Sequence, residues 1–174
     1  MSTISDLKAR LRLPVIAAPM FLVSGPGLVI ASCNAGVIGS FPTANCCTLD
    51  ELDEWLNRIR EALDEGAAPY AVNLIMHRSN SRLQEDLALV VKHEPELVIA
   101  SVGSPAQIID AVHGYGGLVF ADIASVRHAR KAIEAGSDGL ILLTAGAGGQ
   151  TGQANSFAFV RGVRAFFDEP IVLA

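Results

Sequence analysis

The chain has few aromatic residues, few cysteines and little charge of either sign. Of its 174 residues, 6% are aromatic and 18% are charged, and the formal net charge is −5. Lys and Arg do not cluster, and an acidic balance without such a cluster excludes a nucleic-acid surface. No apolar run reaches the roughly 18 residues of a membrane span, and residues 1–12 lack the apolar core of a signal peptide. We therefore expect a cytoplasmic globular protein that binds neither nucleic acid nor membranes.

Cysteine and histidine give no sign of a disulfide framework or a metal site. The three cysteines are an odd number, and two of them, Cys46 and Cys47, are adjacent. Reduced thiols of a cytosolic protein explain them. His77, His93 and His113 show no regular spacing with Asp, Glu or Cys, so we expect no metal. His128 falls one turn into a predicted helix, where a solvated or capping role is ordinary.

What the sequence does contain is an alternation of short aliphatic runs with amphipathic helical stretches. The runs are typical of buried parallel strands, which read as continuous apolar segments because helices cover the sheet. Seven strands are predicted, at Val15–Met20, Val37–Phe41, Tyr70–Met76, Leu97–Val102, Leu118–Ile123, Gly139–Ala145 and Pro170–Ala174.

Helix signals fall between these strands. Thr48 is a predicted N-cap, Glu51 completes a capping box, and Gly66 ends the helix that follows. Three more helices are predicted, from about Ser79 to Glu94, from near Pro105, and from Ser125 to the pair Ala135-Gly136.

Strands and helices at this spacing form parallel βαβ units, which a doubly wound sheet and a closed barrel both contain. The barrel is favoured because no G-x-G-x-x-G follows the first strand and because helix-ending Ala-Gly pairs recur before strands. We predict an α/β fold, a parallel (β/α)8 TIM-type barrel, in one domain over 1–174. Such a barrel needs eight strands. About six and a half units are present, so we expect the natural chain to continue and the two outer strands to be more exposed than the others.

The sites of such barrels lie at the carboxyl ends of the strands. In this sequence two polar residues interrupt predicted strands near those ends. Asn73 and Asp122 each lie in an otherwise aliphatic run. A buried amide or carboxyl group needs partners, so each either ties down a neighbouring loop or acts on a ligand.

The segment 144–152 follows the sixth strand and holds four glycines within seven residues. Glycine lets the backbone approach a ligand closely, so this loop is a candidate binding loop.

These segments together resemble the nitronate monooxygenase family, formerly called 2-nitropropane dioxygenases. The resemblance covers nearly the whole chain and depends on the order of its motifs: Ala18-Pro19-Met20, Asn73, Asp122, Arg127-His128-Ala129, Glu134–Gly139 and Ala145–Gly149. It implies FMN, held without a covalent bond at the mouth of the barrel. The implied cofactor-binding residues are Ala18, Pro19, Met20, Asn73, Gly146, Gly148 and Gly149. The family's phosphate site is built from later loops, so this segment alone is expected to bind FMN poorly.

Position 150 departs from the family pattern. Gln150 stands where the family typically has the histidine proposed to take the α-proton of a neutral nitroalkane. An amide does not accept a proton at neutral pH, so Gln150 can position a substrate but cannot deprotonate it. A nitronate arrives already deprotonated. The catalytic candidates are therefore Gln150, in a doubtful role, and Asp122.

The predicted function is FMN-dependent oxidation of alkyl nitronates by O₂ to a carbonyl compound and nitrite. One alternative is an NAD(P)H-dependent flavin oxidoreductase that acts on a quinone or an enoyl thioester, because hydride delivery needs no histidine here. Another is a flavin- or metabolite-binding module without turnover. The expected partners are a small-molecule substrate and O₂, and the sequence leaves homo-oligomerisation open.

Overall fold

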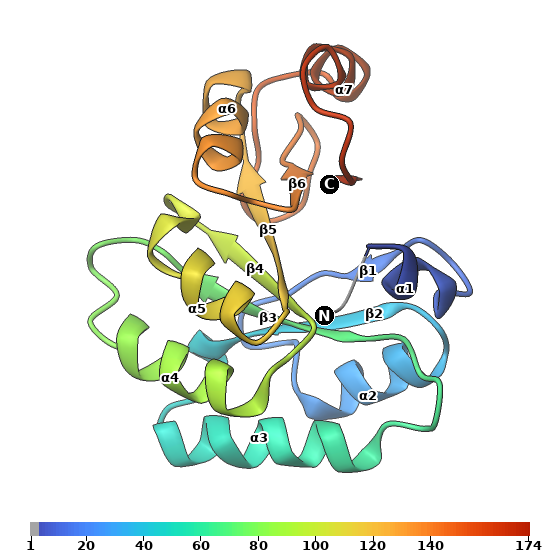
Figure 1. Cartoon of the computed structure of the whole chain (residues 1–174), viewed down its shortest axis with the longest axis vertical. Coiled ribbons are helices and arrows are strands. Elements are labelled where there is room, and N and C mark those ends of the chain that lie inside the picture. The colour runs from blue at the N-terminus through green and yellow to red at the C-terminus, as the bar shows by residue number, and fades with distance from the viewer. Residues whose placement is uncertain (1–3) are drawn as a thin grey trace.

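A computed structural model describes residues 4–174, which contain one seven-stranded sheet (Figure 1). All neighbouring strands are parallel, and their order is β1-β2-β3-β4-β5-β6-β7. A doubly wound sheet would reverse its strand order at a switch point. The sequential order therefore confirms the TIM-type (β/α) barrel architecture. The strands are β1 Ile16–Ala17, β2 Ile38–Pro42, β3 Tyr70–Ile75, β4 Leu97–Ser101, β5 Leu118–Ile123, β6 Gly139–Leu142 and β7 Ile171–Leu173.

Helices alternate with the strands, and all of them except α1 lie against the outer side of the curved sheet (Figure 1). The α-helices are α1 Ile4–Ala9, α2 Pro26–Asn34, α3 Leu49–Ala62, α4 Leu83–His93, α5 Ile109–Gly114, α6 Val126–Glu134 and α7 Ser156–Arg164. Two short 3₁₀ segments, η1 Thr43–Asn45 and η2 Pro105–Gln107, follow β2 and β4.

The sheet separates an inner apolar cluster from the outer ones that pack under the helices. Ile38, Leu97 and Leu118 begin three of the strands and pack with Leu7 of α1 in the inner cluster. This contact places α1 at the amino-terminal end of the barrel interior. The opposite end, where the strands finish, is left for the loops that carry the candidate site.

The capping signals at α3 are confirmed. The Thr48 hydroxyl accepts a hydrogen bond from the Glu51 backbone N–H at 3.1 Å, and the Glu51 carboxylate accepts one from the Cys47 N–H at 2.6 Å.

The predicted start of α4 near residue 79 is wrong by four residues. Asn80 explains the difference, because its side chain donates to the Ile75 carbonyl and accepts from the Arg82 N–H, which holds 76–82 as a turn.

The two outer strands differ from the central five. Every residue of β2 and β4 is buried, whereas β1 is half-buried and β7 ends in Leu173, which is 53% exposed. This matches the expected exposure of the outer strands. β1 is shorter than predicted because the chain turns at Ala18, whose carbonyl accepts a hydrogen bond from the Ser24 hydroxyl.

Candidate functional site

The carboxyl ends of the strands bring polar side chains onto the inner face of the sheet. Side chains alternate between the two faces of a strand. Asn73 has the same parity as Ala71, and Asp122 the same parity as Phe120, and both of those apolar residues belong to the inner cluster. Asn73 and Asp122 therefore point to the barrel interior near its open end. The loops that contain Pro19 and Gly148 follow β1 and β6 at the same end.

Asn73 both holds the sheet together and leaves one polar atom available. Its amide nitrogen donates to the Ile99 carbonyl at 3.0 Å and to the Ser101 hydroxyl at 2.9 Å, so it ties β3 to β4. Within residues 4–174 its amide oxygen accepts no hydrogen bond. A buried amide oxygen normally has a donor, so this atom is placed to accept a hydrogen bond from a ligand.

Asp122 faces a cavity of about 400 Å³ that Gln150 also lines. Its carboxylate accepts no hydrogen bond from the residues the structure describes. Burial raises the pKa of Asp122 to about 7, and no neighbouring cation lowers it. A carboxyl group with such a pKa exchanges its proton near neutral pH, which suits a general acid or base.

The glycine loop presents bare backbone to open space. A Cβ added at Gly146, Gly148 or Gly149 would meet no atom of the packed chain within 4 Å. Gly149 also has φ +66°, a conformation that strains other residues. Gly152 is different, since a Cβ there would lie 2.1 Å from the Leu143 carbonyl oxygen. Packing therefore explains Gly152, whereas Gly148 has no steric reason within the described chain.

Replacing each of these two glycines with Ala should separate folding from binding. Gly152→Ala forces the backbone away from Leu143 and should destabilise the protein by about 1–3 kcal/mol. Gly148→Ala should change stability by less than about 0.5 kcal/mol. Chemical denaturation measures both values. Equal destabilisation by the two substitutions would show that Gly148 has a packing role.

The loop after β1 exposes an apolar surface at the rim. Phe21, Leu22 and Val23 are 64%, 79% and 65% exposed, and Met20 is 41% exposed. Asn45 fixes this loop: its amide donates to the Met20 and Ser24 carbonyls and accepts from the Leu22 N–H. Exposed apolar residues on a loop fixed in this way mark a contact surface. Sequence reasoning missed Asn45, because its partners lie 21 to 25 residues away.

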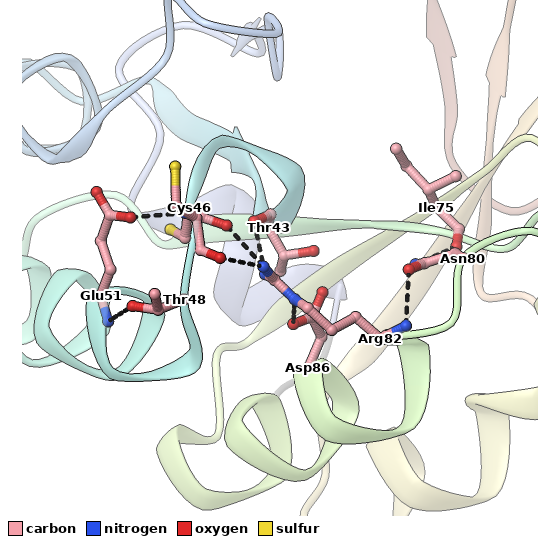
Figure 2. Close-up of polar contacts among 9 residues, drawn as sticks. Thr43, Cys46, Thr48, Glu51, Ile75, Asn80, Arg82 and Asp86 are labelled. Atoms are coloured by element: carbon pink, nitrogen blue, oxygen red, sulfur yellow. Dashed lines mark hydrogen bonds and ion pairs between the residues drawn. The ribbon is translucent and has the colours of Figure 1, made fainter.

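Arg82 joins the loops that follow β2 and β3 (Figure 2). Its guanidinium donates to the carbonyls of Thr43, Cys46 and Cys47 at 3.3, 2.8 and 3.1 Å. It also pairs with Asp86, whose side chain is 3% exposed, at 3.0 Å. The planar fork of Arg suits several acceptors at once. No local motif marked Arg82 in the sequence, since the carbonyls belong to a distant loop.

Arg82→Ala should destabilise the protein by about 3 kcal/mol, because it leaves the Asp86 carboxylate buried without its partner. Arg78 is the matched control, an exposed arginine in the same loop without an ion pair in the described chain. Arg78→Ala should stay within about 0.5 kcal/mol of the parent. Thermal unfolding measures both variants, and similar losses in the two would contradict the role of Arg82.

Three of the four histidines have a protein partner. His93 contacts Asp53 at 2.6 Å, His113 contacts Asp138 at 2.9 Å, and His77 contacts Ser79 at 2.7 Å. The side chain of His128 contacts no polar partner within residues 4–174, and it lines the same cavity as Asp122. Among the described residues, no three His, Cys, Asp or Glu side chains lie together so that they could hold a metal ion. No helix of that part of the chain is long and apolar enough to cross a membrane.

Comparisons with known proteins give relatives for most of the chain. No family model matches the chain. It is 26% identical over 161 residues to (3aS,4S,5R,7aS)-5-hydroxy-7a-methyl-1-oxo-octahydro-1H-indene-4-carboxyl-CoA dehydrogenase from Rhodococcus jostii, covering 92% of this chain and 44% of that protein. The Mycobacterium tuberculosis protein of the same name is 28% identical over 139 residues, covering 80% and 38%. The chain thus spans less than half the length of either curated relative.

Solved structures agree on the fold. FabK from Thermotoga maritima superposes with a TM-score of 0.85 at 23% identity, covering 98% of this chain and 52% of that one. Nitroalkane oxidase from Streptomyces ansochromogenes superposes with a TM-score of 0.83 at 22% identity, covering 96% and 59%. At these identities the likeness shows the barrel architecture, and the chemistry has to be argued from the site.

Proposed function

We propose that the chain forms the cofactor-binding part of an FMN-dependent oxidoreductase. The observation that supports this best is the open rim, where an apolar loop, a free amide oxygen and bare glycine backbone face the same end of the barrel. Such a rim fits a flat, mostly apolar ring with polar edges. The two curated relatives are named dehydrogenases, and one structural neighbour is named an oxidase, which agrees with redox chemistry.

Residues of the loop after β1, of strand β3 and of the glycine loop would hold the flavin. Ala18, Pro19 and Met20 would contact the ring, and the free amide oxygen of Asn73 would accept a hydrogen bond from it. The backbone of the loop containing Gly146, Gly148 and Gly149 would lie beside the ring without side chains in the way. A bound flavin supplies the acceptor or donor of electrons, and the protein supplies binding, orientation and proton transfer.

Oxidation of alkyl nitronates by O₂, giving a carbonyl compound and nitrite, is the proposed reaction. A nitronate needs no general base, which is consistent with Gln150 in place of histidine. The name of one structural neighbour, nitroalkane oxidase, agrees with this substrate class. Gln150, beside the cavity, would orient the substrate through its amide.

A second candidate is the oxidation or reduction of a coenzyme A thioester. It is favoured by one observation, the names of the two curated relatives, both carboxyl-CoA dehydrogenases. In the oxidation direction such a substrate loses a hydroxyl or carbon-bound proton, which Asp122 is placed to take, and in the reduction direction the same carboxyl group would return that proton.

Absorbance spectroscopy of the purified full-length protein tests the proposal. We expect the visible bands of a bound flavin, and a protein without them would contradict the proposed cofactor and favour a metabolite-binding module. Anaerobic mixing then separates the candidates. Bleaching by an alkyl nitronate supports nitronate oxidation, bleaching by a coenzyme A thioester supports thioester oxidation, and bleaching by NADPH supports a reductase.

A further inference from the structure

The sequence as a whole predicts no Lys/Arg cluster, but helix α6 holds three of the chain's thirteen Lys and Arg residues within five positions. It contains Arg127, His128, Arg130 and Lys131, while the whole chain has a formal net charge of −5. Arg130 is used within the fold, since its guanidinium lies 3.9 Å from the centroid of the Phe166 ring. The other three form no ion pair with any residue of the described chain.

Two of these unpaired basic residues share one cavity with the candidate catalytic groups. His128 and Lys131 lie three positions apart and so on the same side of the helix. Both line the cavity of about 400 Å³ that also contains Asp122 and Gln150. Ser104, in the loop after β4, forms part of the facing wall. The cavity therefore runs from the rim of the barrel to the basic side of α6.

The two ends of this cavity differ in charge. Asp122 comes from β5 and points to the barrel interior, whereas His128 and Lys131 lie on helix α6, which packs outside the sheet. A ligand that spans the cavity meets a proton-accepting group at one end and unpaired basic side chains at the other.

We propose that His128 and Lys131 bind a phosphate group of a nucleotide-bearing reactant whose reactive end reaches Asp122 and Gln150. A phosphate carries enough charge and acceptor oxygens to engage an ammonium group and an imidazole together. Two sources share this chemistry, a coenzyme A thioester and a nicotinamide dinucleotide phosphate. The inference rests on the proposed function for the reaction at the Asp122 end, and it names the class of reactant that the same site accepts.

Arg127 provides a matched control for the charge itself. Its side chain is exposed on the same helix but does not line the cavity. If the basic residues of α6 only keep this surface solvated, removal of Arg127 and removal of Lys131 should affect ligand affinity equally. If Lys131 contacts phosphate, only its removal weakens the ligand.

Isothermal titration of the purified full-length protein with coenzyme A and with NADPH tests the inference. In the double variant His128→Gln/Lys131→Gln, the Kd of the phosphate-bearing ligand should rise at least about tenfold, since charge-assisted hydrogen bonds are lost. Arg127→Gln should leave the Kd within about twofold. Both side chains changed in the double variant are exposed, so its unfolding temperature should match that of the parent.

Each outcome decides one point. Weakening of coenzyme A alone identifies a thioester, weakening of NADPH alone identifies a nicotinamide nucleotide, and weakening of both supports a site for the shared phosphate. An affinity that is unchanged in the double variant, or that falls equally in Arg127→Gln, overturns the inference, as does a parent protein that binds neither probe. Flavin absorbance is recorded on the same samples. Its absence would count against the proposed function and leave the phosphate result standing.

Discussion

Asp122→Asn should lower turnover of any substrate that must lose a proton by about 10²–10⁴-fold, the usual contribution of a positioned general base. The carboxyl group faces the cavity, accepts no hydrogen bond from the described residues, and has its pKa raised to about 7 by burial. An amide has nearly the same shape but does not take a proton. Steady-state assays with a thioester substrate and with a pre-formed nitronate measure the effect. Activity on the nitronate should change only a few-fold, because that substrate has no proton to lose.

The pH profile gives an independent readout of the same group. Only ionised Asp122 accepts a proton, so activity on a protonated substrate should rise with pH and level off above about 7. This rise should be absent in Asp122→Asn. A variant that loses activity equally at every pH and on both substrates would show that Asp122 has a structural role.

Stability should depend on pH in the opposite sense. The pKa of Asp122 is raised from 3.8 to about 7, so between these values the folded protein holds a proton that the unfolded chain releases. The Asp122 contribution to the free energy of unfolding is therefore greatest in acid and falls as pH rises towards about 7. Asp122→Asn avoids the buried charge, and it should be more stable than the parent at pH 8. Chemical denaturation at pH 5 and pH 8 measures this difference.

The barrel architecture was predictable because it depends on periodic signals. Aliphatic runs of five to seven residues marked all seven strands, and Thr48 and Glu51 marked a helix start that the structure confirms. Helix α7 was not predicted although Phe159 and Val163 form its buried side, because it is only nine residues long and follows the glycine loop without a capping box. Its N-cap is Asn155, whose side chain accepts from the Phe157 N–H.

The site was predictable only in part, because its key relations are between distant residues. Polar residues at strand ends pointed to Asn73 and Asp122, and the glycine spacing pointed to the loop after β6. The sequence left open whether Asn73 ties the fold together or faces a ligand, and the structure shows that its amide nitrogen ties β3 to β4. The roles of Asn45 and Arg82 depend on loops brought together by folding, and no local pattern encodes them.

Gln150→His should raise activity on neutral nitroalkanes by about 10²-fold or more. The substitution places an imidazole, with an unperturbed pKa of about 6.5, beside the cavity where an amide now stands. Gln150 is exposed and makes no side-chain hydrogen bond within residues 4–174, so the change should leave folding intact. Activity on pre-formed nitronates should stay within a small factor, since they need no proton transfer. Parallel assays of nitrite release from the two forms of one nitroalkane give the ratio directly.

Combining this change with Asp122→Asn decides which group acts as the base. If the new imidazole takes the proton itself, the double variant should keep the gain on neutral nitroalkanes although the carboxyl group is gone. A gain that disappears in the double variant would mean that the imidazole acts through Asp122.

Equal changes on the neutral and ionised substrates would place residue 150 in binding or beside the flavin. No gain on the neutral substrate, with flavin bound, would mean that this cavity is not shaped for nitroalkanes. The thioester candidate, with Asp122 as its base, would then account better for the carboxyl group that faces the cavity.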